Sequence, residues 1–480
     1  MSRLIRALAL LACSFPSSVV AQAARTTWAD AVLGQLDSRA AGYAEVAQRI
    51  WEFAEVGYQE EKSSALLQER LRAAGFTVQA GVAEIPTAFV ASYGSGKPVI
   101  AVLAEYDALP GMSQTSDPVR SPRPDATTGH GCGHSLFGTA SAAAAAALRH
   151  LMEREGLAGT IRLYGTPAEE TVIGKIYMVN AGLFDDVDAV LAWHSLDRTQ
   201  ADYGSTKALV SAKFKFSGLP AHASVSPHQG RSALDAVELM NVGVNFLREH
   251  VEGDARFHYV ITDGGGQPNV VPPQAEVWYY VRADRHADLE GYWRRLNDIA
   301  RGAALMTATE VAVTVDTSTH EVLPNLPLSR LIHRNLELVG PPRFDDADRD
   351  FARRTQEDID PRPEQALSER VEPLPEEPRR APSSTDMGDI SWKVPTGHFS
   401  VATYTYGAPA HSWQIVACSA APIGEKGMLV AAKVMAMSAF DLLAAPAELA
   451  AAREDFVKRT EGTTFTSLVP KGQRAPVRIR

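Results

Sequence analysis

The fold follows first from residues 99–107, which carry the sequence VIAVLAEYD. Residues 99–104 form a short continuous apolar run, the pattern of a strand that is buried on both faces of a sheet. Comparable runs occur at 161–164, 189–193 and 399–406, and helical stretches such as 136–151 and 427–443 lie between them. Because buried strands alternate with helices, the sequence predicts an α/β fold with a largely parallel sheet.

The middle of the chain shows a different pattern. Val210, Ala212, Phe214 and Phe216 alternate with polar residues, as in a strand that is covered on one face only. A helix at 231–250, strands at 258–262 and 276–282, a helix at 289–304 and a strand at 310–315 are expected to follow. The order β-α-β-β-α-β is that of a ferredoxin-like sandwich, here inserted into a larger domain.

A chain of 480 residues is too long for one ordinary hydrophobic core, so more than one domain is expected. The two patterns place the domain boundaries. We expect a signal peptide at 1–23, a catalytic domain built from 24–206 and 319–480, and the inserted domain at 207–318. Residues 341–384 are Pro-rich and charged, with almost no periodicity. They are interpreted as a solvated loop or insertion.

The first 23 residues have the composition of a secretory signal. Arg3 and Arg6 give a positive start, 7–12 are apolar, and small-residue cleavage patterns end at Ala21 and Ala23. The sequence therefore predicts export, to the periplasm or outside the cell. Two alternatives are a ragged N-terminal helix and a lipoprotein box that would anchor the chain through Cys13.

Composition excludes several classes of partner. A hydrophobic content of 45% with 22% charged residues is typical of a folded soluble protein. The net charge of −10 argues against nucleic acid, and the alanine tract at 142–147 is too short to span a membrane. The acidic bulk does not attract anions, so a substrate carboxylate would need specific local residues to bind it.

Potential metal ligands follow the predicted strands. In open α/β sheets, functional sites assemble at the carboxyl ends of the strands. A lone histidine is more often structural, and a Glu-Glu pair is usually solvated. Their joint placement at one edge of the sheet nevertheless predicts a metal site. Its five ligands would be Cys132, His134, Glu170, His194 and His411.

Glu169 stands beside the predicted ligand Glu170 and is free to act as a base. Amide hydrolysis needs a nucleophile, a polarised carbonyl and a proton donor for the leaving nitrogen. Two divalent cations can supply the first two, and one glutamate can carry the proton. The donor set suits zinc, with manganese or cobalt as alternatives, better than magnesium or calcium. With Cys132 as a ligand, Cys418 is expected to be a free buried thiol, and a disulfide between the two is the alternative.

The same segments resemble a known family. Residues 129–135, 167–170, 193–194 and 410–414 are similar to the motifs of the dimetal aminoacylases and carboxypeptidases, which include glutamate carboxypeptidase, hippuricase and the auxin-conjugate hydrolases. Residues 131–138 and 230–240 are most similar to its p-aminobenzoyl-glutamate hydrolase branch. The resemblance covers nearly the whole chain after the signal, except 341–384.

The resemblance implies a role for each matching residue. Cys132 would bridge two metal ions, with Asp107 as the carboxylate behind the ligands and Glu169 as general base and acid. The inserted domain would be a lid and dimerisation domain of a homodimer. There, His222 would reach the neighbouring subunit's site and stabilise the oxyanion. The remaining matches, which would bind the substrate, are Asn269 and Arg282.

The sequence also departs from the family. Ser135 stands where hippuricase-like members carry Asp, and a signal peptide does not fit a branch that is cytoplasmic and works with a partner subunit. The expected substrate is an N-acyl or N-aroyl amino acid or a dipeptide-like amide. The alternatives are a dipeptidase for β-alanyl or γ-aminobutyryl dipeptides and, in a different class, a noncatalytic metal-stabilised binding protein.

Overall fold

The central element is a seven-stranded sheet with the order β1-β2-β6-β3-β7-β15-β8. The computed structural model describes residues 17–171 and 173–477. The four central strands are parallel, and the three outer strands are antiparallel to their neighbours. The predicted α/β class is confirmed, but the sheet is mixed and is parallel only at its centre. The parallel strands are β6 (Gly159–Gly165), β3 (Val99–Ala104), β7 (Ala189–Leu196) and β15 (Thr396–Ala402), and the outer ones are β1 (Thr77–Ala80), β2 (Phe89–Ser95) and β8 (Gln200–Ala201).

The fourth predicted strand is shorter than the apolar run suggested. β15 ends at Ala402 rather than at Tyr406. The backbone N–H of Tyr406 donates to the carbonyl of Ala366, so the chain has already left the sheet. Ala410 and His411 therefore follow on a segment outside the sheet.

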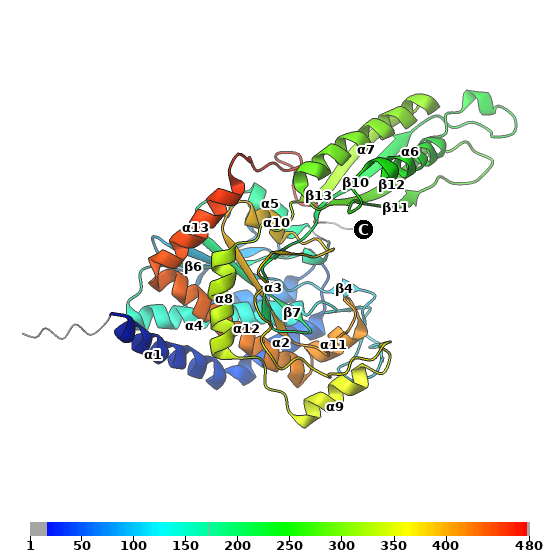
Figure 1. The fold of residues 1–480 in the computed structure, drawn as a ribbon. Helices are drawn as coiled ribbons and strands as arrows, with labels where there is room; N and C mark the ends of the chain where they lie inside the picture. The colour runs from blue at the N-terminus through cyan, green and yellow to red at the C-terminus, as the bar shows by residue number, and fades with distance from the viewer. Residues whose placement is uncertain (1–16, 172, 478–480) are drawn as a thin grey trace, which may run out of the picture.

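Two long helices cover one face of the central strands. α4 (His134–Glu155) and α12 (Pro422–Ala444) contact each other and strand β7. α12 is long and apolar enough to cross a membrane, but it is mostly buried inside the protein, as a core helix is. Further helices pack around this layer (Figure 1). They are α1 (Ser17–Ser38), α2 (Ala40–Phe53), α3 (Glu61–Ala73), α8 (Leu326–Val339) and α13 (Pro446–Thr460).

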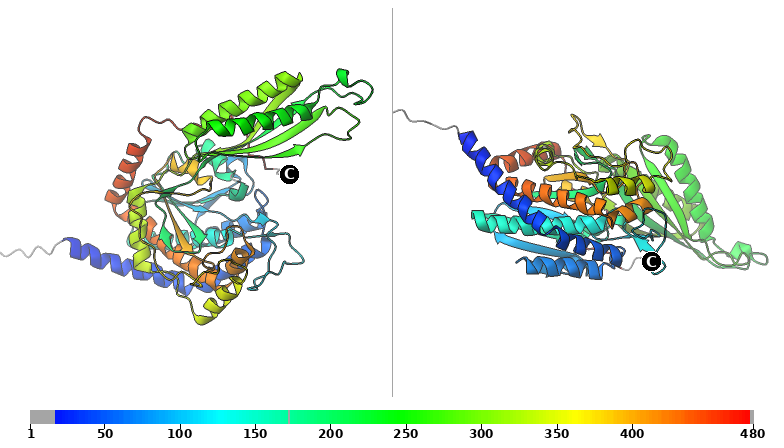
Figure 2. Two further views of the ribbon diagram at one scale, coloured as in Figure 1. Left: turned by 45° about the vertical axis from the view of Figure 1, so that its right-hand side comes forward. Right: turned by 90° about the horizontal axis from the view of Figure 1, so that it is seen from below.

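Residues 208–319 form an arm that projects from this body (Figures 1 and 2). Its sheet has the order β11-β12-β10-β13, is antiparallel throughout, and carries two helices on one face. Val277, Tyr279 and Val281 of β12 are buried, whereas the residues between them are partly exposed on the open face. The order of elements is the one expected: β10 (Ala208–Ser217), α6 (Ala233–Leu247), β11 (Arg256–Asp263), β12 (Gln274–Ala283), α7 (His286–Thr307) and β13 (Glu310–Thr319).

The base of the arm is fixed by aromatic stacking. The rings of His286 and His320 stack with centroids 3.7 Å apart, and Phe465 of the C-terminal segment stacks on His320 at 4.8 Å. His320 Nδ1 lies 2.7 Å from Asp389 Oδ1. Gln473 donates to Tyr177 Oη and to the carbonyl of Val315, which joins body and arm. The last part of the chain therefore touches both parts of the molecule.

The interpretation of 341–384 as a solvated loop is wrong. The segment contains the helix α9 (Asp346–Thr355), which begins with a capping box between Asp345 and Asp348. Phe344, Ala352 and Leu367 are buried together with Ala402 and Ile423 of the body. The apolar residues are too few and too irregularly spaced to give a periodic pattern, yet they suffice for a small core.

The N-terminal prediction falls only partly on described residues. Residues 1–16 of the predicted signal lie outside them. Residues 17–23 form the start of α1, so both predicted cleavage positions lie within this helix. Export remains a prediction.

The small core of 341–384 can be tested by truncating one side chain. Leu367→Ala is expected to lower the free energy of unfolding by about 2–5 kcal/mol, because Leu367 is 5% exposed and packs in this cluster. Urea denaturation measures the change. Leu338→Ala, at a position 50% exposed, is the control and should have little effect. Equal stability of the two variants would show that the segment has no core.

Candidate active site

The five sequence-predicted ligands come together at the carboxyl edge of the parallel strands. They form two groups that share Cys132: Cys132 with His134 and His194, and Cys132 with Glu170 and His411. Within each group the donor atoms lie within 4.8 Å of one another. Cys132 Sγ is 3.6 Å from His194 Nε2, and His411 Nε2 is 3.3 Å from Glu170 Oε2.

A glycine lets the turn before α4 present these donors. Gly133 has φ +75° and is the N-cap of the helix that begins with His134. A Cβ at this position would lie 2.4 Å from Ser195 Oγ, next to His194. Only glycine combines this backbone conformation with so close an approach of the two chain segments. The predicted alternative, a disulfide, is absent between Cys132 and Cys418, which are both free among the described residues.

Two of the imidazoles are oriented by their second nitrogen. His134 Nδ1 lies 2.9 Å from Asp107 Oδ1, and His194 Nδ1 lies 2.7 Å from the carbonyl oxygen of Ser195. A proton on Nδ1 satisfies each acceptor and leaves the lone pair of Nε2 directed into the site. This arrangement is typical of histidines that bind metal.

Hydrogen bonds to two buried carboxylates hold the loop that carries Glu169 and Glu170. Asp107 Oδ2 accepts the backbone N–H of Glu170 at 2.9 Å, and Glu60 accepts that of Ala168 at 2.8 Å. Ala168 has a φ of +61°, which L-residues adopt only when their surroundings enforce it. Asp107, Glu60 and Ala168 are all buried, so the loop position is set by internal contacts of the protein.

Three charged residues at the site are not marked by any sequence motif. Lys175 is fully buried, and its Nζ lies 2.7 Å from Glu105 Oε1 and 2.6 Å from Asp386 Oδ1. Glu105 Oε2 is in turn 3.1 Å from His134 Nε2. For Glu105, its position directly after the first strand is the available signal. Lys175 has none, because its pairing with Asp386 joins segments 211 residues apart.

The electrostatics of the site are those of an acidic cluster. Burial raises the pKa of Glu169 well above its ordinary range, with Glu105 and Asp386 adding to the effect. Burial and the charge of Cys132 raise the pKa of Glu170 to about 7. Burial raises the pKa of the Cys132 thiol, but the neighbouring histidines, above all His194, have the larger combined effect. The pKa of Cys132 is therefore well below its ordinary value.

This cluster fits divalent cations. Glu105 Oε2, His134 Nε2 and Glu170 Oε1 are buried and have no hydrogen-bond partner among the described residues. Lys175 pairs with Glu105 and Asp386, which belong to a larger set of acidic groups at the site, and buried charges without partners are unfavourable. The acidic set comprises Cys132, Glu105, Asp107, Glu169, Glu170 and Asp386. Thiolate, imidazole and carboxylate donors in this number suit late transition metals.

The other predicted site residues lie on the arm, outside the donor groups. His222 and Asn269 are on neighbouring loops at its outer end, where the N–H of Ala223 donates to the carbonyl of Asn269. Arg282 lies near the base, on the sheet face without helices, with its guanidinium 5.4 Å from the Tyr280 ring centre. The structure therefore brings together the five ligands, Asp107 and Glu169, but not these three residues.

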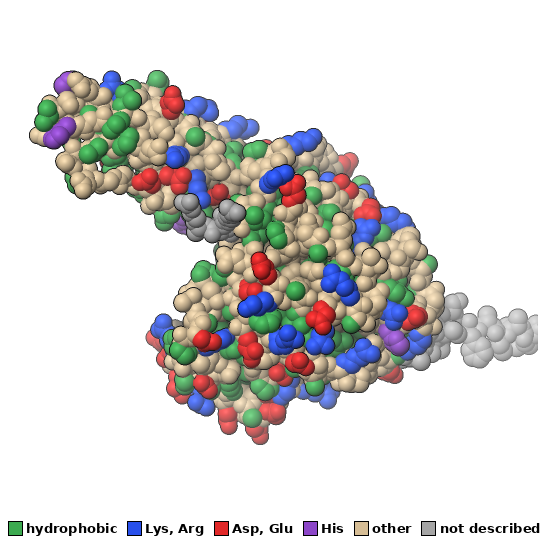
Figure 3. All heavy atoms as spheres, turned by 180° about the vertical axis from the view of Figure 1, so that it is seen from behind, with side chains coloured by type: hydrophobic (Ala, Val, Ile, Leu, Met, Phe, Trp, Pro, Cys, Tyr) green, Lys and Arg blue, Asp and Glu red, His purple; other side chains and the backbone are tan. Residues whose placement is uncertain are grey.

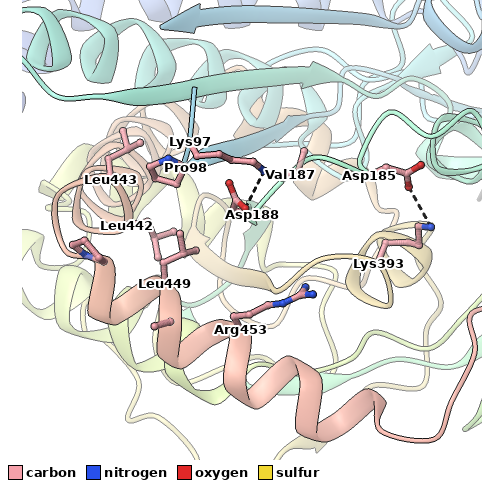
Figure 4. A pocket seen from close by; sticks show the side chains of 12 residues that line it. Lys97, Pro98, Asp185, Val187, Asp188, Lys393, Leu442, Leu443, Leu449 and Arg453 are labelled. Carbon is pink, nitrogen blue, oxygen red and sulfur yellow. Dashed lines mark hydrogen bonds and ion pairs between the residues drawn. The ribbon is translucent and has the colours of Figure 1, made fainter. Parts of the chain in front are cut away.

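A separate cavity of about 750 Å³ lies at the opposite, amino edge of β3 and β7 (Figure 4). Its charged groups pair with one another: Lys97 Nζ is 3.0 Å from Asp188 Oδ1, and Lys393 Nζ is 3.2 Å from Asp185 Oδ1. None of the donor residues lines it. We assign it no part in the chemistry.

Comparison with known proteins gives consistent results. Residues 101–414 match the model of peptidase family M20/M25/M40. The chain is 39% identical to one of the p-aminobenzoyl-glutamate hydrolase subunits of Escherichia coli (strain K12), over 89% of this chain and 95% of that protein. It is 29% identical to the Xaa-Arg dipeptidase of Mus musculus, over 88% of this chain and 90% of that one.

Two solved structures share the fold. A dinuclear metal-binding peptidase of Bacillus subtilis superposes with a TM-score of 0.58 at 18% identity, covering 85% of this chain and 99% of that one. The aminobenzoyl-glutamate utilization protein of Klebsiella pneumoniae gives a TM-score of 0.60 at 19% identity, with 85% and 97% covered.

Asp107 joins the two donor groups, and its removal should weaken both. Asp107→Ala leaves the His134 Nδ1–H and the Glu170 N–H without an acceptor, so metal affinity is expected to fall about 10- to 100-fold. Titration against a competing chelator measures it. Asp389→Ala is the matched control, because it removes an equally buried Asp–His pair at the base of the arm. Similar metal affinity in both variants would contradict the role of Asp107.

Proposed function

The chain belongs to peptidase family M20/M25/M40 and is a metal-dependent amidohydrolase, and we propose that it cleaves the amide of an N-acyl or N-aroyl amino acid or a dipeptide-like substrate. The observation that carries the proposal is the position of Glu169. This carboxylate is the direct neighbour of Glu170 and adjoins two donor groups that share Cys132. The noncatalytic alternative is set aside, since Glu169 and all five donors are present.

We propose that Cys132, His134, Glu170, His194 and His411 hold two divalent ions, with zinc first and manganese or cobalt as alternatives. When bound, such ions polarise the substrate carbonyl and make water a better nucleophile near neutral pH. Glu169 takes the proton from the attacking water and returns it to the leaving nitrogen. Asp107 and Glu60 keep the loop of Glu169 in place through the N–H groups of Glu170 and Ala168.

We further propose that His222 acts in the site of a second copy of the chain. Its Nδ1 accepts the N–H groups of Ser224 and Val225, both at 3.3 Å, so its proton lies on the outward Nε2, where it can stabilise an oxyanion. The exposed Val225 and Val270 flank it. Figure 3 shows hydrophobic and histidine side chains at the outer end of the arm. Such an end suits contact with a second copy.

The substrate's amino-acid part is proposed to carry a free carboxylate. Arg282 is half-buried on the open face of the arm and can bind a carboxylate through two parallel hydrogen bonds. Asn269, beside the loop of His222 at the outer end of the arm, is the second proposed substrate-binding residue. A panel of p-aminobenzoyl-glutamate, N-acyl amino acids and dipeptides, including Xaa-Arg and β-alanyl dipeptides, discriminates between the proposed amide substrate and the dipeptidase alternative.

Export to the periplasm or outside the cell is proposed from the composition of residues 1–23. Arg3, Arg6 and the apolar run at 7–12 support it. Lipoprotein anchoring at Cys13 is the alternative. Mass spectrometry of the mature N-terminus distinguishes the two.

The role of Glu169 predicts a loss of turnover without a loss of metal. Glu169→Gln keeps the shape of the side chain but cannot take up the proton, so kcat should fall at least about 10²- to 10⁴-fold. Steady-state kinetics on the best substrate of the panel measure the change, and elemental mass spectrometry should find the wild-type number of ions. Substantial turnover by this variant would sink the assignment.

The role of His222 predicts rescue between subunits. Glu169→Gln and His222→Ala homodimers should both be nearly inactive. In a mixed dimer, one of the two sites has an intact Glu169 together with an intact His222 from the other chain. Random co-assembly makes half of the dimers mixed, so roughly a quarter of wild-type activity should return. Co-expression with two affinity tags tests this, and an inactive purified heterodimer or an active monomer would contradict it.

A further inference from the structure

We propose that Glu105 is a sixth protein ligand of the metal centre and bonds the ion held by His134. The inference rests on the dimetal centre proposed above and extends it, since the sequence motifs supply only five ligands. Glu105 follows β3 directly, so it lies at the same sheet edge as the other donors. One of its carboxylate oxygens lies within 4.8 Å of donor atoms of His134 and Glu169.

The first argument is an unsatisfied pair of atoms. Glu105 is 4% exposed and His134 is 0% exposed. Glu105 Oε2 and His134 Nε2 face each other at 3.1 Å, and neither has a hydrogen-bond partner among the described residues. A buried carboxylate oxygen without a partner is strongly unfavourable, and a cation between the two atoms would satisfy both.

The second argument is the distance itself. Nitrogen and oxygen donors bind zinc at about 2.0–2.2 Å. Two donors on one ion therefore lie about 3.0 Å apart at a right angle and about 3.4 Å apart at the tetrahedral angle. The 3.1 Å between Glu105 Oε2 and His134 Nε2 falls in this interval. The two atoms are spaced as ligands of a common ion.

The third argument is that Glu105 is held in this orientation. Its other oxygen receives Lys175 Nζ at 2.7 Å. The same Nζ bonds Asp386 Oδ1 at 2.6 Å, and the backbone N–H of Lys175 donates to Asp386 Oδ2 at 2.8 Å. With both ends of the lysine fixed, Oε2 of Glu105 cannot turn away from His134.

Glu60 shows that burial alone does not make such a ligand. It is as buried as Glu105 and lies close to the same loop. Both of its oxygens are used within the protein, because one accepts the N–H of Ala168 at 2.8 Å and the other the hydroxyl of Thr87 at 3.0 Å. It belongs to none of the donor groups. The free oxygen of Glu105 therefore marks a difference in function between two buried carboxylates.

The proposal makes the two halves of the centre unequal. Glu105 forms a third donor group with His134 and Glu169, and His134 also belongs to the group of Cys132 and His194. With Glu105 bonded to it, the ion at His134 would have four protein donors, which is the complement of a closed zinc site. The group of Cys132, Glu170 and His411 has three and keeps a position open, as catalytic sites do. We expect the ion on the His134 side to bind more tightly, and the ion on the His411 side to face the substrate.

The test compares Glu105→Gln with Asp389→Asn in the full chain, because Asp389 is an equally buried carboxylate that pairs with His320 at the base of the arm. Metal-free protein is titrated with Zn²⁺ against a chromogenic chelator, and visible spectra are recorded after loading with Co²⁺. Wild type should bind two ions with unequal affinities. Glu105→Gln should weaken the tighter one about 10- to 100-fold and change the Co²⁺ spectrum. Asp389→Asn should leave both unchanged. Wild-type affinities and spectrum in Glu105→Gln would overturn the proposal.

A second measurement keeps the inference testable if Glu105→Gln does not fold. A crystal structure of the zinc-loaded wild type should place Glu105 Oε2 about 2.0–2.2 Å from an ion. A separation above about 3 Å would overturn the proposal. If wild type binds no ions, the dimetal centre itself fails. If it binds two while Glu105 contacts neither, only the present inference fails.

Discussion

The site depends on one buried carboxylate that serves both donor groups. Asp107 holds His134 through one oxygen and the backbone of Glu170 through the other. It stands on the loop after β3, in the middle of the parallel strands, so its position follows from the core of the sheet. Because His134 and Glu170 belong to different donor groups, this contact fixes the spacing of the two halves of the site. The ligands are thus placed by the scaffold before any ion binds.

Buried charge is the second constraint, and it links the site to the whole body. Acidic groups around the donors repel one another in a region with little water. Lys175 offsets part of this charge and at the same time ties the segment after Glu170 to Asp386, in the part of the body that follows the arm. The catalytic domain is interrupted by the arm, and this ion pair joins its two halves next to Glu169. The contact between Lys175 and Asp386 therefore both stabilises the fold and sets the charge around Glu169.

Most of this arrangement can be predicted from the sequence because strand order and ligand order follow local patterns. Residues 99–104 are recognisable as a buried strand, and Cys132, His134, Glu170, His194 and His411 each adjoin such a strand or the helix between strands. The role of Glu105 is not visible in the sequence because it depends on Lys175, which no local pattern connects to it. The prediction for 341–384 is wrong, since Phe344 and Leu367 make their contacts with Ala402 and Ile423 rather than along one helix. Contacts between residues far apart in the chain, such as these, leave no helical or strand periodicity in the sequence. They therefore cannot be predicted from it.

The C-terminal segment has a consequence for the order in which the protein is completed during synthesis. The arm ends at Thr319 and contains all strands of its own sheet, so it can fold while later residues are still being added to the chain. The contacts at its base include Phe465 and Gln473, which are made after all strands of the arm and of the central sheet. Strand β15 and His411 also come late. The arm can therefore fold before the body is complete, and its contacts with Phe465 and Gln473 can form only after His411 has been made. A protease that removes the segment from Phe465 to Gln473 would loosen the arm and leave every proposed metal donor in place.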